Sequence, residues 1–257
     1  MTVGGVTTTT QPAAPRPADS PVVPRPTWWR EIALILVIYG AYTLTRNTLP
    51  AHTARARANA LDLLHAEQHL HLDVERALNE AVAGHGTNWL SVLADYTYSL
   101  THLGVTVSVL VWLYARRPHA YRAARTALMV ATVLGLVGFW LYPLAPPRFF
   151  PGLGFVDTVV RDGTWGSWAS NVVADTSNEY AAMPSIHLVW ALWSAGALVL
   201  WARPLWLRAL AALYPVVVVL VIVSTANHWT LDAAGGLGAL VVGALVAVAT
   251  SRRRRVP

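Results

Sequence analysis

Two short stretches of the chain carry side chains that could transfer a phosphoryl group. His187 follows Pro184 and Ser185 where one long apolar run begins, and His228 opens another run with Asp232 four residues later. Ionisable groups at the mouth of a membrane segment are costly and usually functional. On a helix, residues four apart share a face, so Asp232 can orient the His228 imidazole and stabilise its charged form. The other ring nitrogen of His228 is then prepared for nucleophilic attack.

The start of the first stretch is suited to binding an anion. We expect Pro184 at the first helical position, where no amide is wasted, and Ser185 satisfying a free amide of the first turn. The remaining amides and the positive end of the helix dipole favour phosphate, with His187 one turn inside. The two histidines therefore predict phosphoryl transfer, with His228 as the nucleophile and His187 as the general acid. A metal site is the alternative, but a metal would occupy the lone pair needed for attack, so we predict no metal and no cofactor.

These motifs resemble the type 2 phosphatidic acid phosphatase superfamily, in which Pro-Ser-x-His precedes His-x-x-x-Asp by about 40 residues. The stretch 142–149, which contains Pro-Pro-Arg148, is similar to the first motif of the branch with the inositol phosphorylceramide synthases. The resemblance covers roughly residues 30 to 250 and implies a membrane lipid phosphate as substrate.

The chain departs from the superfamily pattern at three points, and two of these departures remove a positive charge. It contains no lysine, Ile186 stands where the second motif usually has glycine, and Ile222 stands where the third usually has arginine. These departures leave Arg148 as the main phosphate clamp and argue against simple phosphatidate hydrolysis.

The composition is that of a polytopic membrane protein. The chain has 257 residues, 55% of them hydrophobic and 12% charged. Several runs approach the roughly 20 apolar residues that a spanning helix requires. We therefore predict an all-α fold with six transmembrane helices, near residues 31–48, 88–114, 125–142, 184–201, 205–224 and 228–250. The absence of cysteine excludes disulfides and thiolate metal sites.

The sequence divides into three parts. Residues 1–26 predict a disordered cytoplasmic tail, 27–250 the six-span membrane domain, and 251–257 a basic cytoplasmic tail. Within the domain, 51–85 predicts one or two amphipathic helices on the membrane surface, with the acids on a solvated face. The segment 148–182 is a long outer loop, either a lid or substrate platform or an interfacial aromatic belt.

Three further residues are candidates for substrate binding. Tyr98 and His102 are four apart in the second predicted span, where they form either a wall of the active-site cavity or a structural hydrogen-bonded pair. Arg161, in the outer loop, could fold over the site and supply a second positive charge.

The arginine distribution predicts the topology. With six spans, the N-terminus, 116–125, 203–208 and the Arg252–Arg255 tail fall on one side, which is then cytoplasmic. We therefore predict that the site lies at the outer face of the plasma membrane. The net charge of +6 is explained by these anchors, with anionic lipids as partners near Arg252–Arg255, and nucleic acid is not an expected partner.

The predicted activity is that of a membrane lipid phosphatase or phosphotransferase. Water as acceptor makes the protein a phosphatase, and a polar alcohol such as inositol makes it a transferase that moves a phosphoinositol-type head group between lipids. A non-catalytic lipid-phosphate binder or transporter is the alternative, but it would not need Asp232 behind His228.

Overall fold

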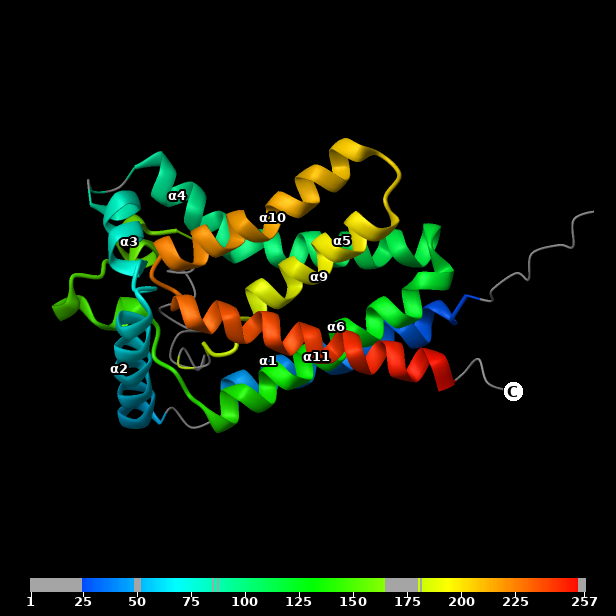
Figure 1. The fold of residues 1–257 in the computed structure, drawn as a ribbon, viewed down its shortest axis with the longest axis horizontal. Helices are drawn as coiled ribbons and strands as arrows, with labels where there is room; N and C mark the ends of the chain where they lie inside the picture. Colours follow the sequence, from blue (N-terminus) through cyan, green and yellow to red (C-terminus); the bar gives the residue numbers. More distant parts are fainter. Residues whose placement is uncertain are drawn as a thin grey trace, which may run out of the picture.

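The computed structural model describes residues 25–48, 52–84, 86, 88–164, 180 and 182–253. Within these ranges the regular structure is helical, which confirms the predicted all-α class. Figure 1 shows long helices running lengthwise beside one another, with shorter ones gathered at one end. The lengthwise helices are α1 (Trp28–Thr48), α4 (Trp89–Tyr96) with the π-helical turn η1 (Thr97–Thr101) and α5 (His102–Arg116), α6 (Pro118–Leu141), α9 (Ile186–Trp201), α10 (Leu205–Ser224) and α11 (Thr230–Arg253).

Every predicted span is helical, but the count of six spans is not confirmed. Four helical segments of the described chain are long and apolar enough to cross a membrane: 89–116, 118–141, 205–224 and 230–252. The α9 helix is apolar but shorter, at 16 residues. The structure therefore supports a membrane protein with several spanning helices.

The α9 helix, which carries His187, is held at the centre of the bundle. It packs against α5, α6, α10 and α11. Two buried tryptophans fix it to α6, because the Trp190 Nε1 donates to Thr132 Oγ1 at 3.0 Å and the Trp193 Nε1 donates to the Ala124 carbonyl at 2.7 Å. Indole N–H groups buried in this way satisfy their only donor while the rings fill the core.

Two helices lie across one end of the bundle, α2 (Thr53–Leu70) and α3 (Glu75–Ala83) (Figure 1). They confirm the helices expected over 51–85. Their acids, however, do not all face solvent as expected. Glu67 and Glu75 are buried, because each lies on the inward face of its helix, Glu67 in register with Ala56, Ala60 and Leu63, and Glu75 in register with Asn79 and Ala83.

Two expected boundaries were wrong. The third span, expected from residue 125, begins earlier, because α6 already starts at Pro118, where proline fits the first turn of a helix. The Pro184 prediction also fails, since α9 begins at Ile186 with Ser185 as its N-cap, and Pro184 lies before the helix.

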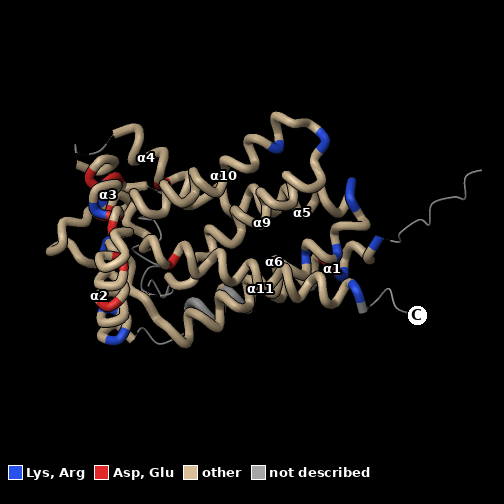
Figure 2. The backbone as a smooth tube through the Cα atoms, viewed as in Figure 1, with Lys and Arg blue, Asp and Glu red and all other residues tan. Residues whose placement is uncertain are grey.

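Charge is distributed unevenly along the bundle. Figure 2 shows arginines at the end where α1 begins and α11 ends, whereas most acidic residues lie at the opposite end around α2 and α3, together with further arginines. Residues 1–24 of the predicted tail, most of the outer segment 165–181, and Arg254 and Arg255 lie outside the described residues.

Candidate active site

The starts of α9 and α11 bring the two predicted histidines into contact. His228 Nε2 lies 3.2 Å from His187 Nδ1, and His228 Nδ1 is hydrogen bonded to Asp232 Oδ2. Asp232 is fully buried and His228 nearly so. When Asp232 is ionised it can only accept, so the His228 Nδ1–H donates to it, and the neutral His228 ring then accepts the Nδ1–H of His187 at Nε2. The result is a linear chain of three groups, carboxylate to imidazole to imidazole.

The Pro184–Ser185 turn is fixed by the helices around it. Ser185 Oγ accepts the Leu188 amide at 3.4 Å, and the Ser185 amide donates to the Asp232 carbonyl at 3.3 Å. The second bond ties the turn directly to α11. Glycines make this approach possible: a Cβ on Gly138 would lie 2.4 Å from the Pro184 ring, and a Cβ on Gly236 would lie 2.7 Å from the Ser185 carbonyl oxygen. A larger residue at 236 would push α11 away from the Pro184–Ser185 turn and so separate the two histidine-bearing segments, and one at 138 would push α6 away from the same turn.

Arg148 lies against the turn that precedes His228. Its backbone amide donates to the Ala226 carbonyl at 2.9 Å, and its guanidinium donates to the Asn227 side-chain oxygen. The same guanidinium forms an ion pair with Asp157, with 3.4 Å between Nε and Oδ2. The first and third predicted motifs therefore meet in space. Neither Asn227 nor Asp157 was predicted as a partner of Arg148.

Tyr98 and His102 are also brought to the histidine pair. The Tyr98 ring stacks on His187 with 4.4 Å between centroids, and the His102 ring meets His187 edge-on at 4.2 Å. His102 Nδ1 also lies 3.0 Å from the Tyr98 carbonyl oxygen, so the two residues are joined to each other as well as to His187. The π-helical turn η1 contains Tyr98 and ends one residue before His102, and such turns occur frequently at functional sites.

These side chains border a cavity of about 260 Å³. It lies between α1, η1 and α5, and the start of α9, and it has polar and apolar walls. Its lining residues are Tyr39, Tyr98, Ser99, His102, Leu103, Ile186, His187 and Trp190.

Arg161 is not brought to this site. It lies in the short helix α7 (Thr158–Asp162), where its guanidinium binds the Asp162 carboxylate and the Ala83 carbonyl. The hydrogen bonds that Arg161 donates to the Asp162 carboxylate raise the pKa of Arg161. The loop around α7 is further held by Asp95, which accepts the hydroxyls of Thr158 at 2.6 Å and Thr164 at 3.1 Å.

Two buried carboxylates that were not predicted support the site from α2 and α3. Glu75 Oε1 accepts the Thr230 amide and Glu67 Oε1 accepts the Leu231 amide, both at 2.7 Å. They therefore cap the first turn of α11, the turn that carries Asp232. Burial, reinforced by the negative charges of Glu75 and Asp232, raises the pKa of Glu67 to about 8.

A signal for these carboxylates is present in the sequence. Glu67 follows Ala56, Ala60 and Leu63 at helical spacing, on the buried face of α2. An acid in register with small apolar residues on one helix face indicates a buried carboxylate with a partner.

Comparison with known proteins agrees with this geometry. The sequence model described as the PAP2 superfamily matches residues 61–247. No curated protein and no solved structure shows a significant match. The matched range contains all three motifs that meet at the histidine pair, and it spans well over half of the sequence. The chain therefore belongs to the PAP2 superfamily.

Proposed function

We propose that this protein is an integral-membrane lipid phosphatase or phosphotransferase that acts through a phosphohistidine intermediate. The observation that carries the proposal is the chain of contacts from Asp232 through His228 to His187. A carboxylate, a nucleophile and an acid in this order are the parts that covalent phosphoryl transfer requires. Membership of the PAP2 superfamily supports a phosphatase-type activity on a lipid phosphate.

In the first step His228 Nε2 attacks phosphorus. The N–P bond forms as the bond from phosphorus to the lipid alcohol oxygen breaks, and His187 gives a proton to that oxygen. Asp232 keeps His228 Nδ1 protonated and stabilises the positive charge that develops on the ring. For this step the substrate must displace the hydrogen bond that joins the two histidines at 3.2 Å.

In the second step an acceptor releases the phosphoryl group. Water or an alcohol attacks phosphorus, the N–P bond breaks, and His187 takes the proton from the acceptor. His187 thus returns to its starting state and acts as acid and base in turn. Water gives a phosphatase and a polar alcohol gives a transferase.

Arg148 is the residue we assign to the phosphate oxygens. It lies beside the turn at Asn227, and a guanidinium suits phosphate because its planar donors match two oxygens. Asp157 already neutralises part of the Arg148 charge, so a bound phosphate must compete with that carboxylate. Pro184 and Ser185 contribute the turn that opens α9, and we assign the free amides of its first turn to the same anion.

The Arg148–Asp157 pair also favours a second candidate, transfer of a phosphodiester head group. A phosphomonoester brings close to two negative charges and a phosphodiester brings one. Asp157 reduces the positive charge that Arg148 can offer, and Arg161 is held by Asp162. Uncompensated charge in a dry pocket is costly, so the site suits the singly charged ligand better. A competition between a phosphatidate and a phosphatidylinositol tests this, and a strong preference for the monoester would contradict it.

The proposed orientation places both termini in the cytoplasm and the histidines toward the outer face of the plasma membrane. The arginine-rich end in Figure 2 supports this, because cytoplasmic ends of membrane helices carry an excess of arginine. This orientation requires six crossings, so α1 and the short α9 also span. Arg252 at the end of α11 would then contact anionic lipids.

Trapping the intermediate tests the proposed function. Purified protein in lipid nanodiscs is given a lipid phosphate labelled at phosphorus, with and without polyol acceptors, and is quenched in base, which preserves phosphohistidine. We expect label on the wild type and none on His228→Ala. Labelled His228→Ala protein, or lipid binding with no turnover and no label, would contradict the assignment and favour a binder or transporter.

A further inference from the structure

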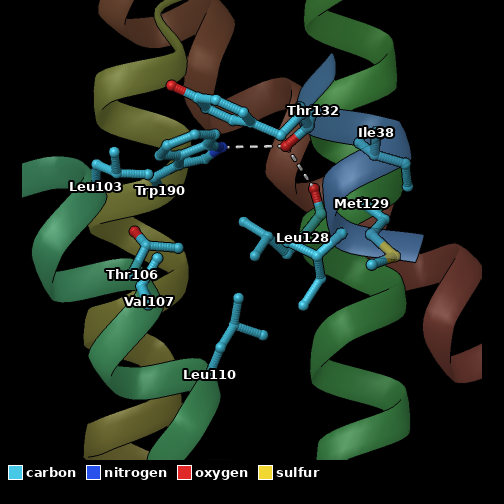
Figure 3. A pocket seen from close by; sticks show the side chains of 11 residues that line it. Ile38, Leu103, Thr106, Val107, Leu110, Leu128, Met129, Thr132 and Trp190 are labelled. Carbon is cyan, nitrogen blue, oxygen red and sulfur yellow. Dashed lines mark hydrogen bonds between the residues drawn. The ribbon is translucent and has the colours of Figure 1, made fainter. Parts of the chain in front are cut away.

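An apolar groove adjoins the histidine cavity and continues along α5. Figure 3 shows its first part, which lies between α1, α5, α6 and α9. Three residues, Tyr39, Leu103 and Trp190, line both this part and the cavity that contains His187. The two spaces are therefore neighbours that share a wall.

The groove continues beyond this first part toward the arginine-rich end of the bundle. Ile35 and Leu110 line both the first part and a further hollow that reaches Val111 and Tyr114. From His102 to Tyr114, α5 advances 12 residues, or about 18 Å at 1.5 Å per residue. Half of a hydrocarbon core is about 15 Å deep. The groove therefore has the depth of one membrane leaflet.

The wall of the groove presents hydrocarbon although it contains polar residues. Trp190 donates to the Thr132 hydroxyl at 3.0 Å, and that hydroxyl donates to the Leu128 carbonyl at 2.9 Å (Figure 3). The Thr106 hydroxyl lies 3.3 Å from the Ser194 hydroxyl. Because these groups bond to one another, the groove is suited to an alkyl chain rather than to a polar ligand.

The far end of the groove is closed by bonded polar groups. The Tyr121 hydroxyl donates to Glu31 at 3.1 Å, Glu31 pairs with Arg125, and the Tyr114 hydroxyl donates to the Pro26 carbonyl at 2.8 Å. An alkyl chain cannot advance past these groups without breaking buried hydrogen bonds. Along its length, however, the rims are accessible from the side, since Val107 on α5 is 47% exposed and Tyr39 on α1 is 43% exposed.

We propose that this groove binds one hydrocarbon chain of the lipid substrate and limits its length. The inference rests on the proposed function, which places the phosphate of the same lipid at His187 and His228. The chain enters sideways between α1 and α5 and extends along α5. Its end meets the Glu31–Tyr121–Arg125 cluster, which lies beside Tyr114, about 18 Å along α5 from His102. Chains longer than this must bend out between α1 and α5.

Photo-crosslinking tests occupancy without requiring turnover. The probe is a phosphatidate with a diazirine at the end of one acyl chain, diluted into phosphatidylcholine vesicles that contain the full-length protein. We expect labelled peptides to include Ile35 and the Leu110–Tyr114 segment, which line the far part of the groove. Label confined to outward residues of α10 and α11, as for bulk lipid, would overturn the proposal whether or not the protein is an enzyme.

A substitution at the junction of the two parts tests the length limit. Ile35→Trp fills the groove beside Leu110, and Val37→Trp, on the exposed side of α1, is the matched control. We expect Ile35→Trp to lower the ratio of kcat/KM for a long-chain over a short-chain phosphatidate by about tenfold or more. Val37→Trp is expected to leave the ratio unchanged. An unchanged ratio in Ile35→Trp would refute the groove assignment. Absence of turnover with every lipid phosphate would instead refute the proposed function, and the crosslinking result alone would then decide whether the groove binds a hydrocarbon chain.

Discussion

Replacing Glu75 by alanine is expected to damage catalysis although Glu75 touches no substrate. Its carboxylate accepts the Thr230 amide at 2.7 Å, and the side chain is 1% exposed. In Glu75→Ala this amide loses its acceptor at the buried start of α11. Loss of an N-cap or of a buried hydrogen-bond partner costs about 1–3 kcal/mol. The first turn of α11 is then free to shift, and Asp232 and His228 shift with it.

The catalytic effect follows from the geometry of the histidine pair. A displacement of about 1 Å at a reacting group can cost roughly 100-fold in rate. We therefore expect Glu75→Ala to lower kcat by about 10- to 100-fold with little change in KM, because Arg148 and the α9 amides still bind the phosphate. Glu75→Gln keeps an acceptor oxygen and should retain most of the activity.

The assay is turnover of a lipid phosphate in nanodiscs, together with thermal unfolding of the same samples. Glu80→Ala, on the exposed side of α3, is the control and should resemble the wild type. Wild-type kcat in Glu75→Ala, or a loss in Glu75→Gln as large as in Glu75→Ala, would refute capping as the role of Glu75. An equal loss of activity and folded protein would show a structural role only.

Three further outcomes are expected. Asp232→Asn should keep lipid binding but lose about three to four orders of magnitude in kcat, because His228 loses its orienting charge; activity near wild type would remove Asp232 from the mechanism. The chain contains no cysteine, so single cysteines can report the topology. Val160→Cys, at an exposed position of α7, should react with an impermeant thiol reagent on intact cells, and Ser251→Cys should not. The reverse pattern would invert the proposed topology. Folded Glu67 holds its proton up to about pH 8, whereas the unfolded carboxyl releases it above about 4.5, so the melting temperature should fall as pH rises through this window. Glu67→Gln should flatten that fall, and an unchanged slope would contradict the buried state of the carboxyl.

The sequence predicted the helices and the contact between His228 and Asp232 because both depend on short-range patterns. Apolar runs of spanning length indicate helices, and the spacing of His228 and Asp232 brings the two side chains together even though α11 begins only at Thr230. The contact between His187 and His228 was expected from their shared chemistry, since no pattern links residues 41 positions apart.

What the sequence did not predict depends on contacts between distant segments. Asp157 pairs with Arg148, and Arg161 turns instead to Asp162 and Ala83, because the loop around α7 is held by Asp95 on α4. A run of loop residues does not indicate which arginine faces the site. Glu67 was placed on a solvated face because charged residues on surface helices usually are, and only its register with the buried alanines of α2 distinguishes it.

The bond between the two imidazoles has a consequence for the protein at rest. While His187 donates its proton to His228, the lone pair that would attack phosphorus is engaged, and no electrophile can reach it without parting the rings. Nearly complete burial of His228 reinforces this shielding. Only a ligand that draws the His187 proton to itself exposes the lone pair. In this arrangement His228 is shielded from reactive small molecules at rest and becomes available as a nucleophile only when an anion separates the two rings.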